Sequence, residues 1–511
     1  MLIIIAILCV FCALSYLYGT RKYGYWSKRG VKHDATIPFF GNAARQILQQ
    51  ISMGDIFTEA YWKYPDERYV GFYLAGRPTL ILRDPELIRS VIAADSSYFY
   101  SRGIMPHKEL YEPLLKNLFF ADGDLWKLLR QRMTPAFTSG KLKAMFPLIV
   151  EKAEKLQEII DEAAATSDEV DVRDIMARYT TDFIGAVAFG IDSDSMKNED
   201  SLFRQVGKRI FTITKWDASR NLFKFIFPDT FRKMYIFPSM IEENIMKLMR
   251  GILKQRNYKP SGRNDFVDQL MELKQKGTIR VESVEHKNPD GSPKLVEMEL
   301  DEYVMAGQMF IFFAAGFETS SSATSYTLHE LAFNPEAQRK CQQEIDKVLS
   351  RYDNKLCYEA VCEMKYLDMC LKEGMRLFPS LGWLKRRCER AYAVPGAGFS
   401  IDAGVDVVVP VNGLHRDARH WDQPERFLPE RFEQPLKHKF VYLPFGEGPR
   451  ACVGERLGRM QSLAGLAALL RGFAVEPAAR TRREPPRDPT TAVVQSVLGG
   501  IPLRVRRRHP L

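Results

Sequence analysis

The amino-acid sequence predicts a mainly α-helical protein with small β-sheets. Charged residues recur at spacings of three and four from about residue 107 to 275, and an almost continuous apolar segment covers 304–317. Both patterns are typical of helices, the second of a helix buried on every side. Segments rich in Val, Ile, Tyr and Phe are short and are bounded by turn residues, as expected of small sheets.

One large domain is expected after a membrane segment. The chain has 511 residues, 46% of them hydrophobic, and no repeat or low-complexity segment divides it after residue 40. We therefore expect a membrane anchor over 1–20, a juxtamembrane linker over 21–37 and one folded domain over 38–511.

The charge distribution argues against nucleic acid as a partner. The formal net charge is +10, and the basic excess is spread along the chain except for the run 504–508. Because no compact basic-aromatic motif accompanies this run, it favours anionic lipid or an acidic protein. A solvated basic surface is the alternative. The eight cysteines match neither a disulfide framework nor a zinc site.

The N-terminal segment has the features of a membrane helix. Residues 1–18 carry no charge, and Arg21, Lys22, Lys28 and Arg29 follow them. This length and flank fit a single spanning helix whose basic side stays cytoplasmic. A cleaved signal peptide is the alternative, but a basic region before the apolar run is missing.

The remaining elements are expected in this order. Strand-like segments 69–74 and 78–82 suggest a hairpin, and Asn288 to Gly291 marks an exposed loop. A long helix begins after Asp301, which can cap it, and ends at Asn334 because a residue before proline avoids helical geometry. Short helices then continue to about 378, before a strand at 405–411, a loop-rich region to 453, a helix at 454–471 and a hairpin at 493–505.

A glycine-rich loop around Cys452 carries the clearest chemical signal. Three glycines and a proline make a tight loop around the cysteine, and the third glycine, Gly454, opens a helix. Backbone N–H groups and a helix N-terminus can lower the pKa of a thiol at such a place. The resulting thiolate is a strong electron-donating ligand for iron. The alternative is a buried cysteine beside a helix start.

Phe445, Gly448, Arg450, Cys452 and Gly454 match, position for position, the haem-binding signature of the cytochrome P450 family. The chain therefore resembles that family. The resemblance implies the cytochrome P450 fold, a triangular α-rich body around a buried haem b. It also implies that Cys452 binds the iron and that 38–511 is a haem-thiolate monooxygenase domain.

The long helix contains an acid and an alcohol, Glu318 and Thr319, within an apolar stretch. Such groups are unfavourable there unless they have partners. In the family, the matching pair delivers protons to oxygen, and the residue that matches Gly316 allows the helix to open locally. The alternative is that Thr319 bonds the carbonyl of Ala315 and Glu318 reaches a neighbour.

Other family motifs imply further roles. Trp126 and Arg130 resemble the pair that binds a haem propionate, and Arg450 and Arg386 are further candidates for that role. Lys385 and Arg387 flank Arg386, so a shift of one residue would change the choice. Residues that resemble the family's buried structural network are Glu373, Arg376 and Arg431.

The apolar substrate wall implied by position favours lipophilic small molecules. From about 38 to 505 the chain most resembles insect microsomal members that metabolise plant toxins and insecticides, with the finer resemblance in 135–141, 312–319 and 444–450. The expected wall residues are Phe119, Phe120, Ile311, Ala314, Ala315, Leu381 and Val497.

The resemblance also implies partners and a location. No Gly-rich dinucleotide fingerprint is present, so electrons are expected from NADPH through a separate flavoprotein reductase, with cytochrome b5 as a further partner, at the endoplasmic reticulum membrane. Lys127, Arg132 and Arg456 are candidate contacts for the reductase. Two alternatives remain, a haem-thiolate isomerase or lyase and a non-catalytic protein that binds haem or lipophiles.

Overall fold

The computed structural model describes residues 2–105, 112–191, 195–196, 202–227, 229–263, 265–491 and 493–508. It confirms a mainly α-helical protein with small sheets. The α-helices are α1 (Leu2–Thr20), α2 (Ala44–Ile47), α3 (Met53–Lys63), α4 (Pro85–Arg89), α5 (Gly123–Met133), α6 (Ser139–Thr166), α7 (Val172–Ile184), α8 (Leu202–Phe211), α9 (Lys215–Ile226), α10 (Ser239–Gln255), α11 (Phe266–Gln275), α12 (Glu302–Phe333), α13 (Pro335–Leu349), α14 (Tyr358–Glu363), α15 (Lys365–Leu377), α16 (Val411–Leu414) and α17 (Glu455–Gly472).

The strands form four small sheets. The largest has the order β1-β2-β9-β6, another has the order β10-β11-β3, and β4-β5 and β7-β8 are separate pairs. The strands are β1 (Tyr69–Leu74), β2 (Arg77–Leu82), β3 (Val170–Asp171), β4 (Ile279–Lys287), β5 (Pro293–Met298), β6 (Leu384–Arg387), β7 (Tyr392–Ala393), β8 (Ser400–Ile401), β9 (Asp406–Val409), β10 (Phe473–Pro477) and β11 (Pro502–Arg507).

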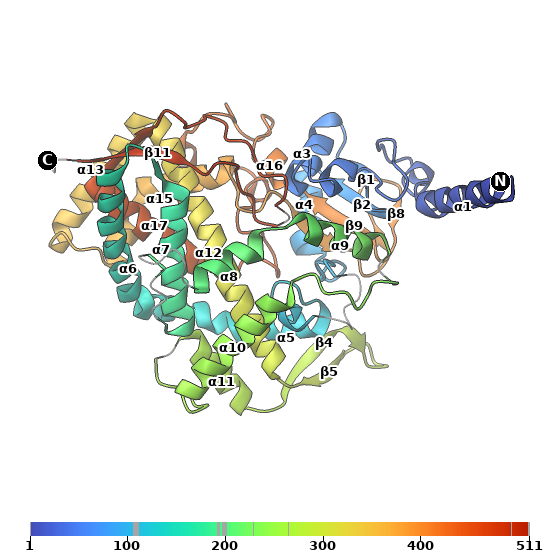
Figure 1. The fold of residues 1–511 in the computed structure, drawn as a ribbon, viewed down its shortest axis with the longest axis horizontal. Coiled ribbons are helices and arrows are strands. Elements are labelled where there is room, and N and C mark those ends of the chain that lie inside the picture. The colour runs from blue at the N-terminus through green and yellow to red at the C-terminus, as the bar shows by residue number, and fades with distance from the viewer. Residues whose placement is uncertain are drawn as a thin grey trace.

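Helix α1 projects from one end of the body, beside the sheet that contains β1 and β2 (Figure 1). It has 19 residues and is apolar enough to cross a membrane. Packed structure begins soon after it, because Trp26 is fully buried and its Nε1 donates to the carbonyl of Phe72 at 2.9 Å. The segment expected to be a linker therefore lies against the body from Trp26 onward.

Helix α12 is the central element and runs through the middle of the body (Figure 1). The Asp301 side chain caps its first turn by accepting the Val304 N–H at 2.7 Å, as predicted. Pro335 opens α13 directly after its end. Most of its side chains are buried, so it organises the core around it.

The expected hairpin at 69–82 is present as β1 and β2, and its turn uses Ala75 and Gly76 at positive φ. The hairpin expected at 493–505 is wrong. Instead, β11 pairs with β10 and with β3, so its partners lie far away in the sequence, where local turn signals carry no information. A second difference is the β4–β5 hairpin, which flanks the predicted loop at 288–291.

The basic run at the C-terminus is paired within the protein. Arg506, Arg507 and Arg508 form ion pairs with Glu476, Asp161 and Asp346 respectively. These acids lie in three different elements, so three arginines of the run are paired with carboxylates of the folded domain. This pairing favours the solvated basic surface over a patch that binds lipid.

A buried charge network joins α15 to the loop that precedes Cys452. Arg376 Nε donates to Glu373 at 2.7 Å, and Arg431 Nε donates to the same carboxylate at 3.0 Å. Glu373 and Arg376 have no exposed surface. Arg376 also donates to the carbonyls of His415 and Pro424, so the network fixes the course of the loop.

Glu373→Gln should therefore destabilise the protein strongly. The change leaves Arg376 buried without its counter-charge, which costs about 3–5 kcal/mol. Denaturant unfolding of the purified protein, together with its soluble yield, measures the effect. The matched control is Glu336→Gln, since Glu336 also pairs with an arginine three residues on but is exposed on α13. Equal stability of the two variants would contradict a structural role for the network.

Candidate functional site

The loop before Cys452 is a tight turn held at several points. The Cys452 N–H donates to the Phe445 carbonyl at 2.9 Å. Helix α17 begins at Glu455, and Gly454 is its N-cap. Gly448 has φ +75, and a Cβ there would lie 1.9 Å from the Ile92 carbonyl oxygen. Only glycine fits this position, because both the backbone conformation and the close approach exclude a side chain.

Cys452 lies deep in the protein and yet keeps accessible surface. Accessible surface that is surrounded by protein belongs to an internal space. Burial raises the pKa of the Cys452 thiol, while the Gly454 N–H and the arginines Arg130 and Arg102 oppose the rise. The Gly454 N–H lowers the pKa of the thiol in the expected direction, but burial outweighs this lowering. A coordinating metal ion deprotonates such a thiol directly.

Three arginines lie in this region: Arg102 and Arg130 are half-buried and act on the Cys452 thiol, and Arg386 is buried near Arg102. Burial lowers the pKa of Arg102 to about 10 and that of Arg386 to about 9, and it also lowers the pKa of Arg130. Asp122 is the acid nearest to Arg102 and Arg386. Buried cations are unfavourable without anionic partners. The two propionates of a haem would supply the missing charge, so these residues fit a haem with Cys452 as its iron ligand.

Arg130 is positioned by the loop itself. It lies one helical turn after Trp126 on α5, and its Nη1 donates to the Ala451 carbonyl at 2.6 Å. Helix α5 is thus attached directly to the residue before Cys452. Trp126 and Arg130 are four residues apart and share one face of α5.

Arg450 has a different environment from the other arginines. Its guanidinium donates to the carbonyls of Tyr100 and Ala121 and to Asp122, and it stacks 4.0 Å above the Trp126 ring. These contacts tie three segments together behind the cysteine loop. Arg450 therefore holds the cysteine loop against these segments.

The register of β6 distinguishes Arg386 from its neighbours. Lys385 pairs with Asp406 at 2.8 Å, and Arg387 donates to the Gly103 carbonyl at 2.7 Å. Side chains alternate along a strand, so Arg386 points to the opposite face, where Arg102 lies. Arg386 forms no ion pair with any residue that the structure describes, and it remains the candidate on this strand.

Helix α12 has an accessible stripe although it is central. Ala315 is exposed, and Ile311 and Thr319, four residues before and after it, are half-buried. Residues four apart share a helix face, so this face borders an internal space. The stripe ends near α17, because a Cβ on Gly458 would lie 3.8 Å from Ser320 Oγ. The stripe and the cysteine loop therefore belong to one region.

Glu318 and Thr319 both have protein partners. The Thr319 hydroxyl donates to the Ala315 carbonyl at 2.7 Å, and the Glu318 carboxylate forms an ion pair with Arg173 of α7. These are the contacts of the non-catalytic alternative. Burial raises the pKa of Glu318, and Arg173 opposes the rise. Gly316 packs closely on Ile184, where a Cβ would lie 2.6 Å from a side-chain carbon.

The predicted wall residues gather around α12 to different extents. The segment that carries Phe119 and Phe120 docks at Gln308, whose side chain accepts the Leu118 N–H at 3.0 Å. Ser380, next to Leu381, donates to the Thr319 carbonyl at 3.0 Å. Half-buried wall residues are Phe119, Phe120, Ile311 and Leu381. Ala314 and Val497 are each only 5% exposed.

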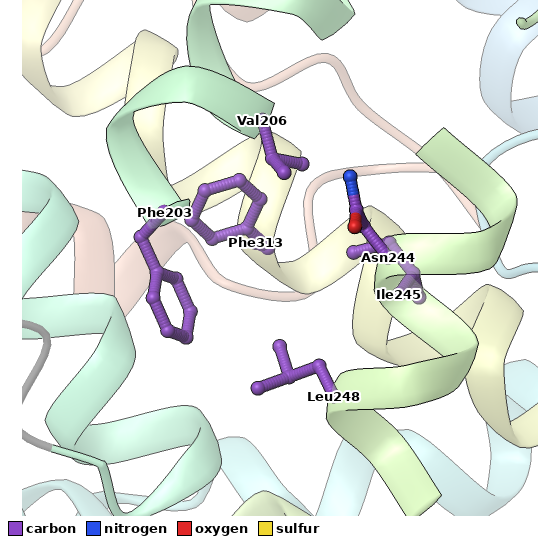
Figure 2. Close-up of a pocket in the computed structure, with 6 residues that line it drawn as sticks. All are labelled: Phe203, Val206, Asn244, Ile245, Leu248 and Phe313. Atoms are coloured by element: carbon purple, nitrogen blue, oxygen red, sulfur yellow. The ribbon is translucent and has the colours of Figure 1, made fainter. Parts of the chain in front are cut away.

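A separate small pocket lies on the other side of α12 (Figure 2). Phe203 and Val206 of α8, Asn244, Ile245 and Leu248 of α10 and Phe313 of α12 line it, and Asn244 is its only polar residue. Phe313 is two residues from both Ile311 and Ala315, which places it on the opposite face of the helix. This pocket is therefore distinct from the space beside Cys452.

Two residues of the site carry no sequence signal. Arg102 donates to the carbonyls of Phe119 and Arg450, and Arg173 holds Glu318. Tertiary folding brings Arg102 to Arg450 and Arg173 to Glu318, each more than one hundred residues away in the sequence. Arg102 lies in a loop without a recognisable motif, and Arg173 lies in the amphipathic helix α7, so neither position stands out in the sequence.

The comparisons with known proteins agree with this geometry. The cytochrome P450 family matches residues 32–501. Cytochrome P450 6a2 of Drosophila melanogaster is 36% identical over 516 residues, which cover 99% of each chain. Cytochrome P450 6B2 of Helicoverpa armigera is 35% identical, covering 98% of this chain and 97% of the relative. Cytochrome P450 6B1 of Papilio polyxenes is 34% identical, covering 94% and 95%.

Two findings decide the family of this chain. The family model matches most of its residues, and the relatives are similar over nearly its whole length. The cysteine loop, the three arginines and the central helix all lie within the matched residues. The chain belongs to the cytochrome P450 family and is a P450 monooxygenase.

Proposed function

We propose that this monooxygenase inserts one oxygen atom of O2 into lipophilic foreign molecules, such as plant toxins and insecticides, and reduces the other atom to water. Its electrons come from NADPH through a separate flavoprotein reductase, with cytochrome b5 as a second donor. The observation that carries the proposal is the accessible Cys452 thiol beside the accessible face of α12.

The apolar surroundings support a lipophilic substrate. Ile311 and Ala315 supply carbon atoms to the accessible face, and Phe119, Phe120 and Leu381 lie beside it. Binding of an apolar ligand against such a lining is favourable because it removes apolar surface from water. The relatives are insect proteins, which favours foreign compounds from the diet as substrates.

The membrane helix supports the proposed location. Helix α1 is exposed over most of its length, and the basic residues after it favour the cytoplasmic side. An anchor at the endoplasmic reticulum would place the domain beside a membrane-bound reductase and lipid-dissolved substrates. Lys127, Arg132 and Arg456 are the proposed contacts for the reductase. Arg132 and Arg456 are exposed, and Arg456 donates to Ser139 at 2.9 Å.

A haem held by the Cys452 thiolate would supply oxygen activation, because a thiolate ligand donates electron density that favours cleavage of the O–O bond. Glu318 and Thr319 manage the protons. Burial raises the pKa of Glu318, so its carboxyl can hold a proton away from bulk water. The Thr319 hydroxyl becomes a donor toward the internal space when it leaves the Ala315 carbonyl.

The overall function is tested with the purified full-length protein, the reductase and vesicles. We expect a lipophilic compound to stimulate consumption of NADPH that depends on O2, and ¹⁸O2 to label the product with one atom. Rearrangement of a lipid hydroperoxide without NADPH, at rates that match any NADPH-dependent turnover, would instead favour the isomerase or lyase. Ligand binding without turnover would indicate a binding protein.

Glu318→Gln should reduce product formation by about 100-fold, because an amide cannot replace a carboxyl in proton transfer. We expect the yield of product per NADPH to fall and hydrogen peroxide to rise, while the affinity for the lipophilic compound stays the same. The control is Glu302→Gln on the same helix, an exposed residue that pairs with Arg250 at 3.2 Å. Unchanged coupling in the Glu318 variant would exclude the proton role.

A further inference from the structure

The β4–β5 hairpin lies beside α5, the helix that is bonded to the cysteine loop. It forms a separate two-stranded sheet and packs against α5 (Figure 1). Helix α5 is in turn joined to the cysteine loop, because Arg130 donates to the Ala451 carbonyl at 2.6 Å. The hairpin is thus connected through α5 to the loop that carries Cys452.

The position of the hairpin on α5 is fixed by a buried carboxylate. Asp124, in the first turn of α5, accepts the Ser283 hydroxyl and the Val284 N–H, both at 2.7 Å. Asp124 and Ser283 are 7% and 5% exposed. The Glu285 carboxylate lies against Gly123, where a Cβ would approach it to 2.4 Å. These contacts leave β4 little freedom to slide along the helix.

This arrangement brings an acid of the hairpin to a cation of α5. The Glu282 carboxylate lies 3.6 Å from Lys127 Nζ, with exposed side-chain fractions of 63% and 22%. Lys127 is one of the three cations proposed to receive the reductase. Arg132, on the last turn of the same helix, is exposed and has no carboxylate partner among the residues that the structure describes.

We propose that the hairpin is the rim of the surface that docks the electron donor, and that Glu282 competes within the chain for Lys127. An acidic side chain of the donor displaces Glu282 when the complex forms. When the complex forms, the Glu282–Lys127 ion pair is replaced by an ion pair between Lys127 and the donor. An acidic protein that cannot also bind Arg132 gains no further ion pair on α5, so competition from Glu282 lowers its affinity. This inference rests on the proposed function, because it assumes a reductase that docks beside α5.

The expected effect is modest, because the pair is exposed. Pairs of this kind change an equilibrium by about two- to fivefold. They are also screened by salt, so the effect should be greatest at low ionic strength and vanish at high ionic strength.

The test compares two substitutions on the hairpin in the full-length haem protein. Glu282→Gln should tighten the complex with an NADPH-dependent flavoprotein reductase about two- to fivefold at low salt. Glu297→Gln removes the same charge from the same hairpin, but Glu297 pairs with Arg280 at 2.7 Å instead of with α5. It should leave the dissociation constant near that of the wild type. Equal effects of the two changes, or no effect of Glu282→Gln, would overturn the inference.

A double substitution separates this inference from the proposed function. If Glu282 acts through Lys127, then Glu282→Gln should have no effect on the dissociation constant in a Lys127→Gln background. A dependence that persists in that background would overturn the competition. The proposed function fails separately if the wild-type protein is not reduced by NADPH and the reductase at all.

Discussion

Burial of the Cys452 thiol is the constraint on which the rest of the site depends. A buried thiol resists ionisation, and burial outweighs the help that Gly454, Arg130 and Arg102 give to the thiolate. For Cys452 to bind iron as a thiolate, the metal ion itself must favour loss of the thiol proton, and the loop must hold the sulfur in place. Gly448 packed on the Ile92 carbonyl and the Arg130 bond to Ala451 provide that rigidity.

A second constraint is charge balance around the same space. Asp122 is the carboxylate that acts on Arg102 and Arg386, and Arg130 is influenced by the Cys452 thiol, which leaves positive charge for an anionic group to neutralise. The thiolate and two carboxylates of a haem meet this requirement together. In the neighbouring network, Arg376 and Arg431 both pair with Glu373. This network holds the loop without using Asp122 or the anionic groups expected from a haem.

Local patterns explain which parts could be predicted from sequence. The cysteine loop, the cap of α12 at Asp301 and the β1–β2 turn depend on residues close together in the chain, and all three are present. The pairing of β11 with β10 and β3 depends on distant partners, and the expected hairpin there was wrong. Arg102 and Arg173 escaped prediction for the same reason, since only folding brings them to the site. The β4–β5 hairpin was hidden because its polar outer face resembles a loop.

The central claim is that Cys452 is the thiolate ligand of a haem iron. The most direct measurement is the absorption spectrum of the reduced, carbon-monoxide-bound protein, recorded for the wild type and for Cys452→Ser. We expect a thiolate-type spectrum from the wild type and its complete loss in the variant, because an alcohol does not donate electrons to iron as a thiolate does. A thiolate-type spectrum that survives the substitution would contradict the claim.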